Sequence, residues 1–285
     1  MRALVIGASG LVGGALMRAL GEDATGTYLT RARPGLVPLD ARDASAVRRV
    51  IDETRPDIVL VPAADPNVDW CEAHPDEARS RNLGPVRAVL ASAGDRRVLS
   101  FSSDYVFDGA AGPYSEDAAR RPLSVYGWIK AEMEDLLLDA GQTVVRTTTV
   151  FGYEADPPKN FVLRLTTSLR HGERARIPSD QLSTPTFADD LATACAHIAG
   201  GDSGIWHVAG PEQMPRTELA RRVCRAFDLP EELIVPTPTV ELGQRAPRPP
   251  AGGLLSSRYE KVFGLAPVRA VDDALATLRS RLDPR

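Results

Sequence analysis

Short, uninterrupted apolar runs alternate with longer amphipathic segments through the first half of the chain. Apolar runs of this length predict strands buried on both faces, whereas apolar positions three and four residues apart predict helices. Strands are predicted at residues 2–6, 24–28, 57–61, 97–101 and 143–148. Helices are predicted at residues 11–20, 43–54, 76–92 and 124–140. This repeated order predicts an α/β fold, a doubly wound parallel sheet covered by helices on both faces.

The second half of the chain has a less regular pattern. After Gly152 we expect a helix at residues 160–170 and a short extended stretch at 176–178, and prolines interrupt much of the remainder. A short apolar run at residues 206–208 is expected to return to the main sheet. We therefore predict that residues 153–285 mainly form a smaller C-terminal lobe, whose loops cover the carboxyl edge of the sheet.

Composition and charge narrow the possible partners. The chain has 285 residues, of which 43% are hydrophobic, which is enough for a large core. Its 34 basic and 38 acidic residues give a formal net charge of −4, and aromatic residues make up 6%. Nucleic-acid binding is therefore not expected, because it requires a concentration of basic charge.

The spacing of the cysteines, the histidines and the N-terminal apolar residues argues against disulfides, a metal site and a membrane span. Three scattered cysteines without a CxxC pair are expected to be buried, reduced thiols, which indicates the cytoplasm. Four histidines without ligand spacing predict no metal site. Glycines break the N-terminal apolar run, and no window reaches the ~18 apolar residues of a membrane span. We therefore expect a soluble, cytoplasmic protein without a membrane partner.

A glycine-rich turn lies between the first predicted strand and the first predicted helix. Gly7, Gly10 and Gly13 have the order and position of a dinucleotide-binding fingerprint. Such glycines allow a tight turn, close approach of a pyrophosphate and close helix–strand packing, while the helix N-terminus attracts phosphate. The turn predicts a Rossmann dinucleotide-binding domain over residues 1–152. The alternative is a glycine-rich turn that only packs.

Basic residues follow the second predicted strand, where NAD-binding proteins commonly place an acid on the ribose. Arg31 and Arg33 stand there, and residues 27–33 contain no acid. A guanidinium suits the 2′-phosphate of NADP, which a carboxylate would repel. We therefore expect NADPH or NADP⁺ as the cofactor and NADH less, unless both arginines are simply solvated. Asp40, after a third short strand, is either a contact to the adenine edge or a turn residue.

Tyr126 and Lys130 lie four residues apart on a predicted helix, and therefore on one face of it. Reduction of a carbonyl group needs a proton donor for the oxygen. A tyrosine can serve beside an ammonium that lowers its pKa and holds the cofactor ribose. Ser103, after the strand ending at Phe101, would place a hydroxyl beside the same oxygen. Because such a spacing also arises by chance, the prediction of a catalytic set depends on the glycine turn upstream.

Together these motifs resemble those of the extended short-chain dehydrogenases/reductases. The chain is similar in particular to the dTDP-4-dehydrorhamnose reductase group, which includes the regulatory β subunit of methionine adenosyltransferase. The octet SSDYVFDG followed by YxxxK is a fairly specific signature of this group. The matching segments span nearly the whole chain: GASGLVGGAL (7–16), VPAADPNVDWCE (61–72), Asn82, SSDYVFDG (102–109), PLSVYGWIK (122–130), VRTTTVFG (145–152), KNF (159–161), DQLSTPT (180–186), FADDLA (187–192) and the arginine–proline stretch at 245–249.

The resemblance implies roles for individual residues. The catalytic triad would be Ser103, Tyr126 and Lys130. The cofactor would be lined by Gly7, Gly10, Leu11, Val12, Arg31, Ala63, Ala64 and Asn82. The substrate would be faced by Asp104, Tyr105, Asn160 and Arg248. Two positions depart from the group: Ser103 stands where threonine is common and keeps the hydroxyl, and Thr149 stands where tryptophan is common and removes a flat surface for the sugar.

Three functions remain open on this resemblance. The first is an NADPH-dependent reductase of the keto group of a nucleotide-activated 4-keto-6-deoxysugar, with Arg248 against the substrate phosphate. The second is an NADP-binding regulatory module that docks on a partner enzyme such as methionine adenosyltransferase. The third, a sugar-nucleotide epimerase or dehydratase, is weaker, because Asp104 and Tyr105 stand where dehydratases carry an Asp-Glu pair. The sugar, the base and the choice between monomer and homodimer stay open.

Overall fold

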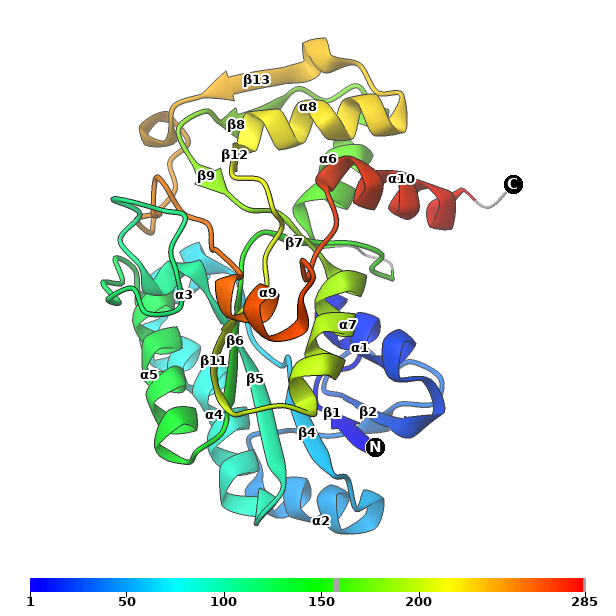
Figure 1. The fold of residues 1–285 in the computed structure, drawn as a ribbon. Helices are drawn as coiled ribbons and strands as arrows, with labels where there is room; N and C mark the ends of the chain where they lie inside the picture. The colour runs from blue at the N-terminus through cyan, green and yellow to red at the C-terminus, as the bar shows by residue number, and fades with distance from the viewer. Residues whose placement is uncertain (156–158, 284–285) are drawn as a thin grey trace.

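A seven-stranded parallel sheet forms the centre of the molecule in this computed structural model, which describes residues 1–155 and 159–283 (Figure 1). Its strands lie in the order β11-β6-β5-β4-β1-β2-β3 and every neighbouring pair is parallel. The strands are β1 (Ala3–Val5), β2 (Ala24–Tyr28), β3 (Val37–Pro38), β4 (Ile58–Val61), β5 (Arg97–Ser103), β6 (Thr143–Thr147) and β11 (Gly204–His207). The predicted doubly wound parallel sheet is confirmed. The strand order reverses beside β1, where sheets of this kind bind their ligands.

Helices cover both faces of this sheet. They are α1 (Leu11–Leu20) and α7 (Ala188–Ala199) on one face, and α2 (Ala44–Thr54), α4 (Pro75–Ala93) and α5 (Val125–Asp139) on the other. Alternate side chains of β1 pack into the two layers: Ala3 and Val5 face α1, and Leu4 faces α4. All three are at most 3% exposed. Burial on both faces explains why the strands are continuous apolar runs in the sequence.

The C-terminal lobe lies beyond the carboxyl ends of the strands, at the top of Figure 1. Its helices are α6 (Phe161–Arg170), α8 (Arg216–Phe227) and α10 (Val271–Leu282). Its short strands pair as β7 (Val150–Phe151) with β10 (Thr186–Phe187), β9 (Leu182–Ser183) with β12 (Met214–Pro215), and β8 (Ala175–Pro178) with β13 (Ile234–Thr237). Two further helices, α3 (Val68–Ala73) and α9 (Ser257–Phe263), lie near the sheet.

Residues 153–285 return to the main sheet more extensively than the sequence pattern indicates. β11 extends the sheet beside β6, and α7 packs along α1. Helices α7 and α8 were not predicted from the pattern. Both begin without a side-chain cap, directly after Phe187 and Pro215, so the capping signal that usually marks a helix start is missing.

Three further features bear on possible functions. None of the helices within residues 1–155 and 159–283 is long and apolar enough to cross a lipid bilayer. In the same part of the chain no three side chains that commonly bind metals come together as a site. The three cysteines are free and buried, and burial raises the pKa of Cys71 to about 11, which keeps this thiol protonated.

Candidate active site

Two adjoining cavities open at the carboxyl ends of the central strands. The glycine cavity, of about 460 Å³, lies between the glycine turn, the end of β2 and the loop after β4. The tyrosine cavity, of about 480 Å³, lies between Ser103, Tyr126, Lys130 and the C-terminal lobe. The residues common to both are Gly7, Gly10, Arg31, Pro62, Ala64, Pro66 and Lys159. The two cavities therefore form one cleft.

The glycine turn packs so closely that side chains would not fit. Gly7 has a φ of +94°, and a Cβ there would lie 3.0 Å from Ala63 Cα. A Cβ on Gly13 would lie 2.2 Å from the Gly7 carbonyl oxygen. Gly10 caps α1 without a side chain, so the N-terminus of α1 faces the cleft with its own amide groups. This is the cradle that a pyrophosphate needs, and Leu11, Val12, Ala63 and Ala64 complete it as predicted lining residues.

Arginines reach the cleft beyond β2. Arg31 lines both cavities, and its buried Nη1 has no hydrogen-bond partner although the Glu154 carboxylate lies 3.7 Å away. Arg33 is not among the residues lining either cavity. Asp40 lines the glycine cavity, but Arg42 holds its carboxylate through Nε at 2.9 Å and Nη2 at 2.7 Å, which lowers the pKa of Asp40. Of the arginines beyond β2, Arg31 and Arg42 therefore line this end of the cleft.

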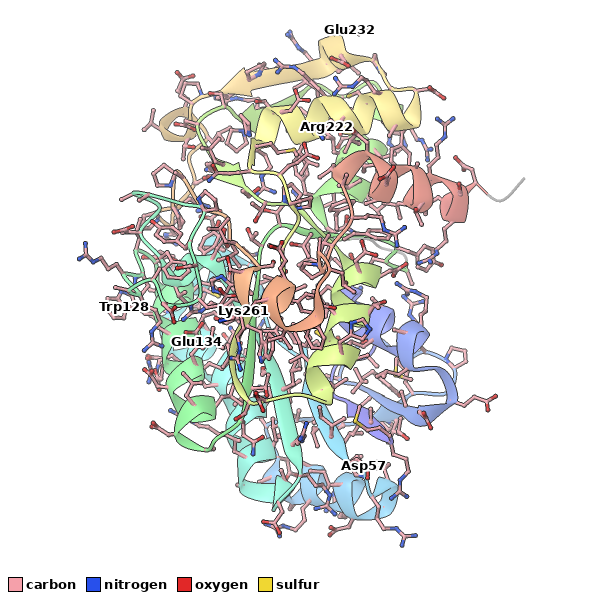
Figure 2. All side chains as sticks on the ribbon, viewed as in Figure 1. Asp57, Trp128, Glu134, Arg222, Glu232 and Lys261 are labelled. Carbon is pink, nitrogen blue, oxygen red and sulfur yellow. The ribbon has the colours of Figure 1, made fainter. Side chains whose placement is uncertain are left out.

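Tyr126 and Lys130 face inward from α5, and Ser103 ends β5 beside them in the tyrosine cavity. The Lys130 Nζ donates to the Phe101 carbonyl at 2.8 Å and lies 5.7 Å from the centroid of the Tyr126 ring. Trp128, midway between them in sequence, is 62% exposed and points away from the molecule (Figure 2). The four-residue spacing thus places the predicted pair on the buried side of α5 and leaves the exposed side to Trp128.

Burial shifts both catalytic pKa values toward the uncharged form. It raises the pKa of Tyr126 well above its usual value, so the hydroxyl keeps its proton. Burial also lowers the pKa of Lys130 to about 8, although Glu134 opposes this shift. The lowering of the tyrosine pKa expected from the Lys130 ammonium is not among the main effects on Tyr126 in this structure, where burial is the largest. A tyrosine in this state is a proton donor rather than a base.

Asp104 connects Ser103 to the C-terminal lobe. Ser103 donates to its Oδ1 at 3.1 Å, and Thr148 Oγ1 and the Gly253 amide donate to its Oδ2 at 2.7 and 3.1 Å. Burial raises the pKa of Asp104. Tyr105 lies in the same cavity, with its ring edge-on to Tyr126 and the centroids 5.7 Å apart. Both residues line the cavity, but Asp104 uses its hydrogen bonds on the protein itself.

Arg248, predicted to face the substrate phosphate, is held in an ion pair. Its Nη1 and Nη2 donate to the two carboxylate oxygens of Asp69 at 2.7 and 2.8 Å, and its side chain is 10% exposed. This pair lowers the pKa of Asp69 to about 2 and ties the stretch before Pro249 to α3. Arg248 is not among the residues lining the cleft, because Asp69 already occupies its guanidinium.

The side chains of the two predicted asparagines make hydrogen bonds within the protein. Asn82 is buried on α4, where it accepts from the Asp65 amide at 3.1 Å and donates to the Ala78 carbonyl. It therefore holds the loop that lines the cleft without lining the cleft itself. Asn160 lines the tyrosine cavity, but its side chain caps α6 at the Leu163 amide.

The fold and this site correspond to a known family over almost the whole chain. The model of the RmlD substrate binding domain matches residues 1–282. The chain belongs to this family, that of the dTDP-4-dehydrorhamnose reductases. In this member of the RmlD family, the cleft joins the glycine turn, the inward-facing Tyr126–Lys130 pair and the lobe over the carboxyl edge of the sheet.

Relatives within the RmlD family carry different names. Methionine adenosyltransferase 2 subunit beta of Danio rerio is 32% identical over 277 residues, which cover 93% of this chain and 85% of the relative. A probable low-salt glycan biosynthesis reductase of Haloferax volcanii is 30% identical over 291 residues, which cover 97% of each chain. A dTDP-4-dehydrorhamnose reductase of Bacillus anthracis, solved in complex with NADP, superposes with a TM-score of 0.88 at 24% identity, covering 98% of this chain and 99% of that one. The family thus includes reductases and a subunit of another enzyme.

Sequence reasoning missed several residues of this RmlD-family site. Arg216 at the start of α8 and Gln181 before β9 reach the tyrosine cavity from the lobe, and Lys159 lies where the two cavities meet. Thr149 also lines the cavity, with a φ of +43° that is uncommon for a β-branched residue. No local signal marks Arg216 or Gln181, because the strand pairing of the lobe brings them to the site.

Proposed function

We propose that this chain is an NADPH-dependent reductase of the keto group of a nucleotide-activated 4-keto-6-deoxysugar. The observation that carries the proposal is the single cleft in which Ser103, Tyr126 and Lys130 adjoin the glycine turn. A hydride donor held by that turn and a proton donor on α5 would face the same space. In this proposal residues 1–152 bind NADPH, and residues 153–285 mainly bind the substrate.

The residues of the cleft fit a dinucleotide with a 2′-phosphate. The glycine turn leaves no room for a Cβ on Gly13 and presents the N-terminus of α1. The orphaned Nη1 of Arg31 is a donor without a hydrogen-bonded acceptor, as a site for a further phosphate requires. Arg42, the second cation at this end, is held by Asp40. When bound, the reduced nicotinamide supplies a hydride.

The side chains of the tyrosine cavity can complete the reduction. A ketone gains a hydride at carbon and a proton at oxygen and becomes an alcohol. Tyr126, whose pKa is raised by burial, gives the proton to the oxygen, and the Lys130 ammonium stabilises the tyrosinate that remains. Ser103 donates a hydrogen bond to the same oxygen once it turns from Asp104, 3.1 Å away.

The test of this function is turnover. Purified protein is mixed with NADPH and a panel of nucleoside-diphosphate 4-keto-6-deoxysugars, with simple ketones as controls, and NADPH absorbance is followed. Oxidation of NADPH that requires the ketosugar supports the proposal, and the alcohol product identifies the reduced position. If no member of the panel is reduced, the reductase proposal is rejected.

The cofactor preference is a separate prediction. We expect NADPH to bind more tightly than NADH, because Arg31 offers a free donor and no acid follows β2. Fluorescence titration should show the preference as a ratio of the two dissociation constants. Arg31→Ala should reduce this ratio by about tenfold, the scale of a charge-assisted hydrogen bond. Arg174→Ala, which removes an exposed arginine outside the cleft, is the control and should leave it unchanged. Equal affinities in the parent chain would contradict the prediction.

The pKa of Lys130 predicts how cofactor binding depends on pH. An amine with a pKa of about 8 is charged below that pH and neutral above it, so its contact with a ribose weakens as the pH rises. We expect the Kd for NADPH to rise between about pH 7 and about pH 9, by up to about tenfold per pH unit above the pKa. Lys130→Met should bind more weakly at pH 7 and lose this dependence. A parent chain with a flat profile would show that Lys130 makes no such contact.

A regulatory module is the second candidate, and the 32% identity to a methionine adenosyltransferase subunit favours it. In that case the chain would bind NADP and a partner enzyme, and the Ser103–Tyr126–Lys130 set would be idle. Co-purification with a methionine adenosyltransferase from the same cell, together with no turnover of ketosugars, would support this candidate. Dehydration or epimerisation is the weaker third candidate, because Asp104 is hydrogen-bonded on both oxygens and Tyr105 follows it.

A further inference from the structure

Arg216 lines the tyrosine cavity and is stacked on an aromatic ring there. It begins α8, is half-buried, and places its guanidinium carbon 5.0 Å from the centroid of the Phe161 ring. Within residues 1–155 and 159–283 its side chain makes no hydrogen bond and meets no carboxylate at ion-pair distance. Removing a guanidinium from water is costly unless an anion compensates for it. A bound anion in contact with Arg216 would therefore offset this cost.

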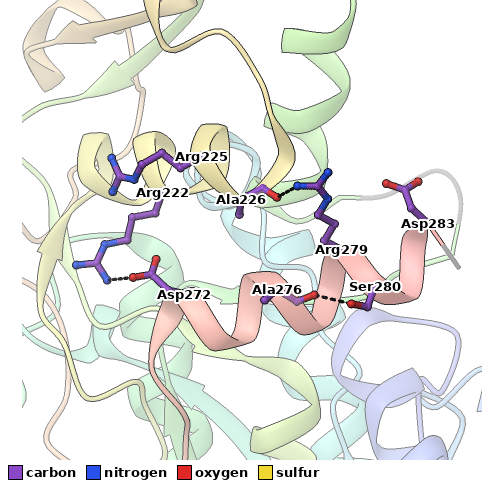
Figure 3. Close-up of a pocket in the computed structure, with 8 residues that line it drawn as sticks. All are labelled: Arg222, Arg225, Ala226, Asp272, Ala276, Arg279, Ser280 and Asp283. Atoms are coloured by element: carbon purple, nitrogen blue, oxygen red, sulfur yellow. Dashed lines mark hydrogen bonds and ion pairs between the residues drawn. The ribbon is translucent and has the colours of Figure 1, made fainter. Parts of the chain in front are cut away.

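Two other arginines of α8, Arg222 and Arg225, are paired with carboxylates. Arg222 meets Asp272 of α10 at 3.5 Å, and Arg225 meets Glu218 at 3.0 Å. Both line a groove of about 920 Å³ between α8 and α10, outside the cleft (Figure 3), and Arg222 is also marked in Figure 2. That groove is larger than either cavity, but its arginines are neutralised. Arg216 is the member of this set that faces the cleft.

The other cations of the tyrosine cavity lie beside Tyr126 or at the junction with the glycine cavity. Lys130 is bonded to a backbone carbonyl beside Tyr126, and Arg31 lies 3.7 Å from Glu154 at the junction with the glycine cavity. Lys159 is exposed at that junction. The Asp104 carboxylate attracts Arg216 at longer range, but its hydrogen bonds go to other groups. Arg216 is thus the free cation on the lobe side of the cavity, among the residues that the structure describes.

We propose that Arg216 binds the diphosphate of the nucleotide-activated substrate and so selects nucleotide sugars over free sugars. This inference rests on the proposed function. A guanidinium can donate two parallel hydrogen bonds to phosphate oxygens. The Phe161 ring lies against the Arg216 guanidinium. The Arg216 backbone amide donates to the Gln181 carbonyl at 2.9 Å, which fixes the start of α8. Arg248, the sequence-based candidate for this role, is held by Asp69 instead.

Binding of nucleotides without the sugar tests this role independently of turnover. Protein saturated with NADP⁺ is titrated by calorimetry with dTDP, UDP and thymidine. Arg216→Met should weaken binding of dTDP and UDP by about tenfold or more and leave thymidine unchanged, as expected for a lost charge-assisted contact. Arg216→Lys keeps the charge but not the planar donor pair, so its affinity for dTDP and UDP should lie between those of the parent and Arg216→Met. Arg164→Met removes an exposed arginine near Arg216 and is the matched control, expected within about twofold of the parent.

The outcomes show whether Arg216 or another group binds the diphosphate. The proposal is overturned if Arg216→Met binds dTDP as the parent does, if the parent binds neither diphosphate, or if Arg248→Met alone loses the affinity. Unchanged NADP⁺ binding by Arg216→Met shows that the variant is folded. Binding of dTDP that depends on Arg216, in a protein that reduces no ketosugar, would uphold the diphosphate site and reject the reductase.

Discussion

Tyr126→Phe should lower kcat for reduction of the ketosugar by about 10²-fold or more. A positioned general acid contributes about 10²–10⁴-fold, and this substitution removes the donated proton while keeping the ring. The ring is 8% exposed and packs edge-on against Tyr105, so phenylalanine fits the same space. Stopped-flow or steady-state measurement of NADPH oxidation gives kcat, and fluorescence titration should give a Kd for NADPH close to that of the parent.

Tyr114→Phe is the matched control for this experiment. The Tyr114 hydroxyl donates to Asp108 at 2.7 Å, and the residue is not among those lining the cleft. Its loss removes one hydroxyl from the protein without touching the proposed chemistry, so kcat should stay within about twofold of the parent. Full activity in Tyr126→Phe would show that another group donates the proton, and the mechanism would be wrong.

Gly13→Ala should disrupt the glycine turn. A Cβ at this position would lie 2.2 Å from the Gly7 carbonyl oxygen and 2.7 Å from Ala8 Cα, and backbone atoms cannot rotate away as a side chain can. We expect the free energy of unfolding to fall by about 3 kcal/mol or more, the upper end for overpacking. NADPH binding should weaken with it, by at least ~10-fold, because α1 and the turn must separate. Thermal unfolding with and without NADPH measures both effects.

Gly14→Ala, one residue further on, should have the opposite effect on stability. The nearest atom to a Cβ there is Arg18 Nη1 at 3.5 Å, which is an ordinary contact with a flexible side chain. Alanine in the interior of α1 should therefore raise the free energy of unfolding by up to about 1 kcal/mol and leave NADPH binding intact. If both variants changed stability and NADPH binding in the same way, the close packing of Gly13 against Gly7 would not explain the loss in Gly13→Ala.

Short-range patterns were sufficient to predict the sheet, the glycine turn and the common face of Tyr126 and Lys130. Continuous apolar runs identify buried parallel strands, because each strand packs on both faces. The turn follows from Gly7 and Gly13, where backbone meets backbone within a few residues. The spacing of Tyr126 and Lys130 fixes their common face of α5, since helical geometry alone decides it. Each of these features depends on neighbours in the chain.

The charge state of the site was beyond the reach of the sequence. Proximity in the chain predicted that Lys130 would lower the pKa of Tyr126, yet burial raises that pKa and lowers the pKa of Lys130 to about 8. Desolvation depends on all the atoms that exclude water from a group, and most of these come from other elements. Similarly, Asn82 was predicted at the cofactor but supports the loop at Asp65 from behind.

The amino-acid sequence by itself determined the order of strands and helices, the turn that can hold a dinucleotide, and the face of α5 that carries the chemistry. Only the tertiary structure decided which arginine is free. Asp69 and Arg248 are 179 positions apart, and their contact engages the guanidinium for which sequence resemblance implied a phosphate role. Arg216 reaches the cavity because β12 pairs with β9, and among the described residues no carboxylate lies within ion-pair distance of its guanidinium. An ion pair depends on which opposite charge lies nearest in space, and folding alone sets that distance.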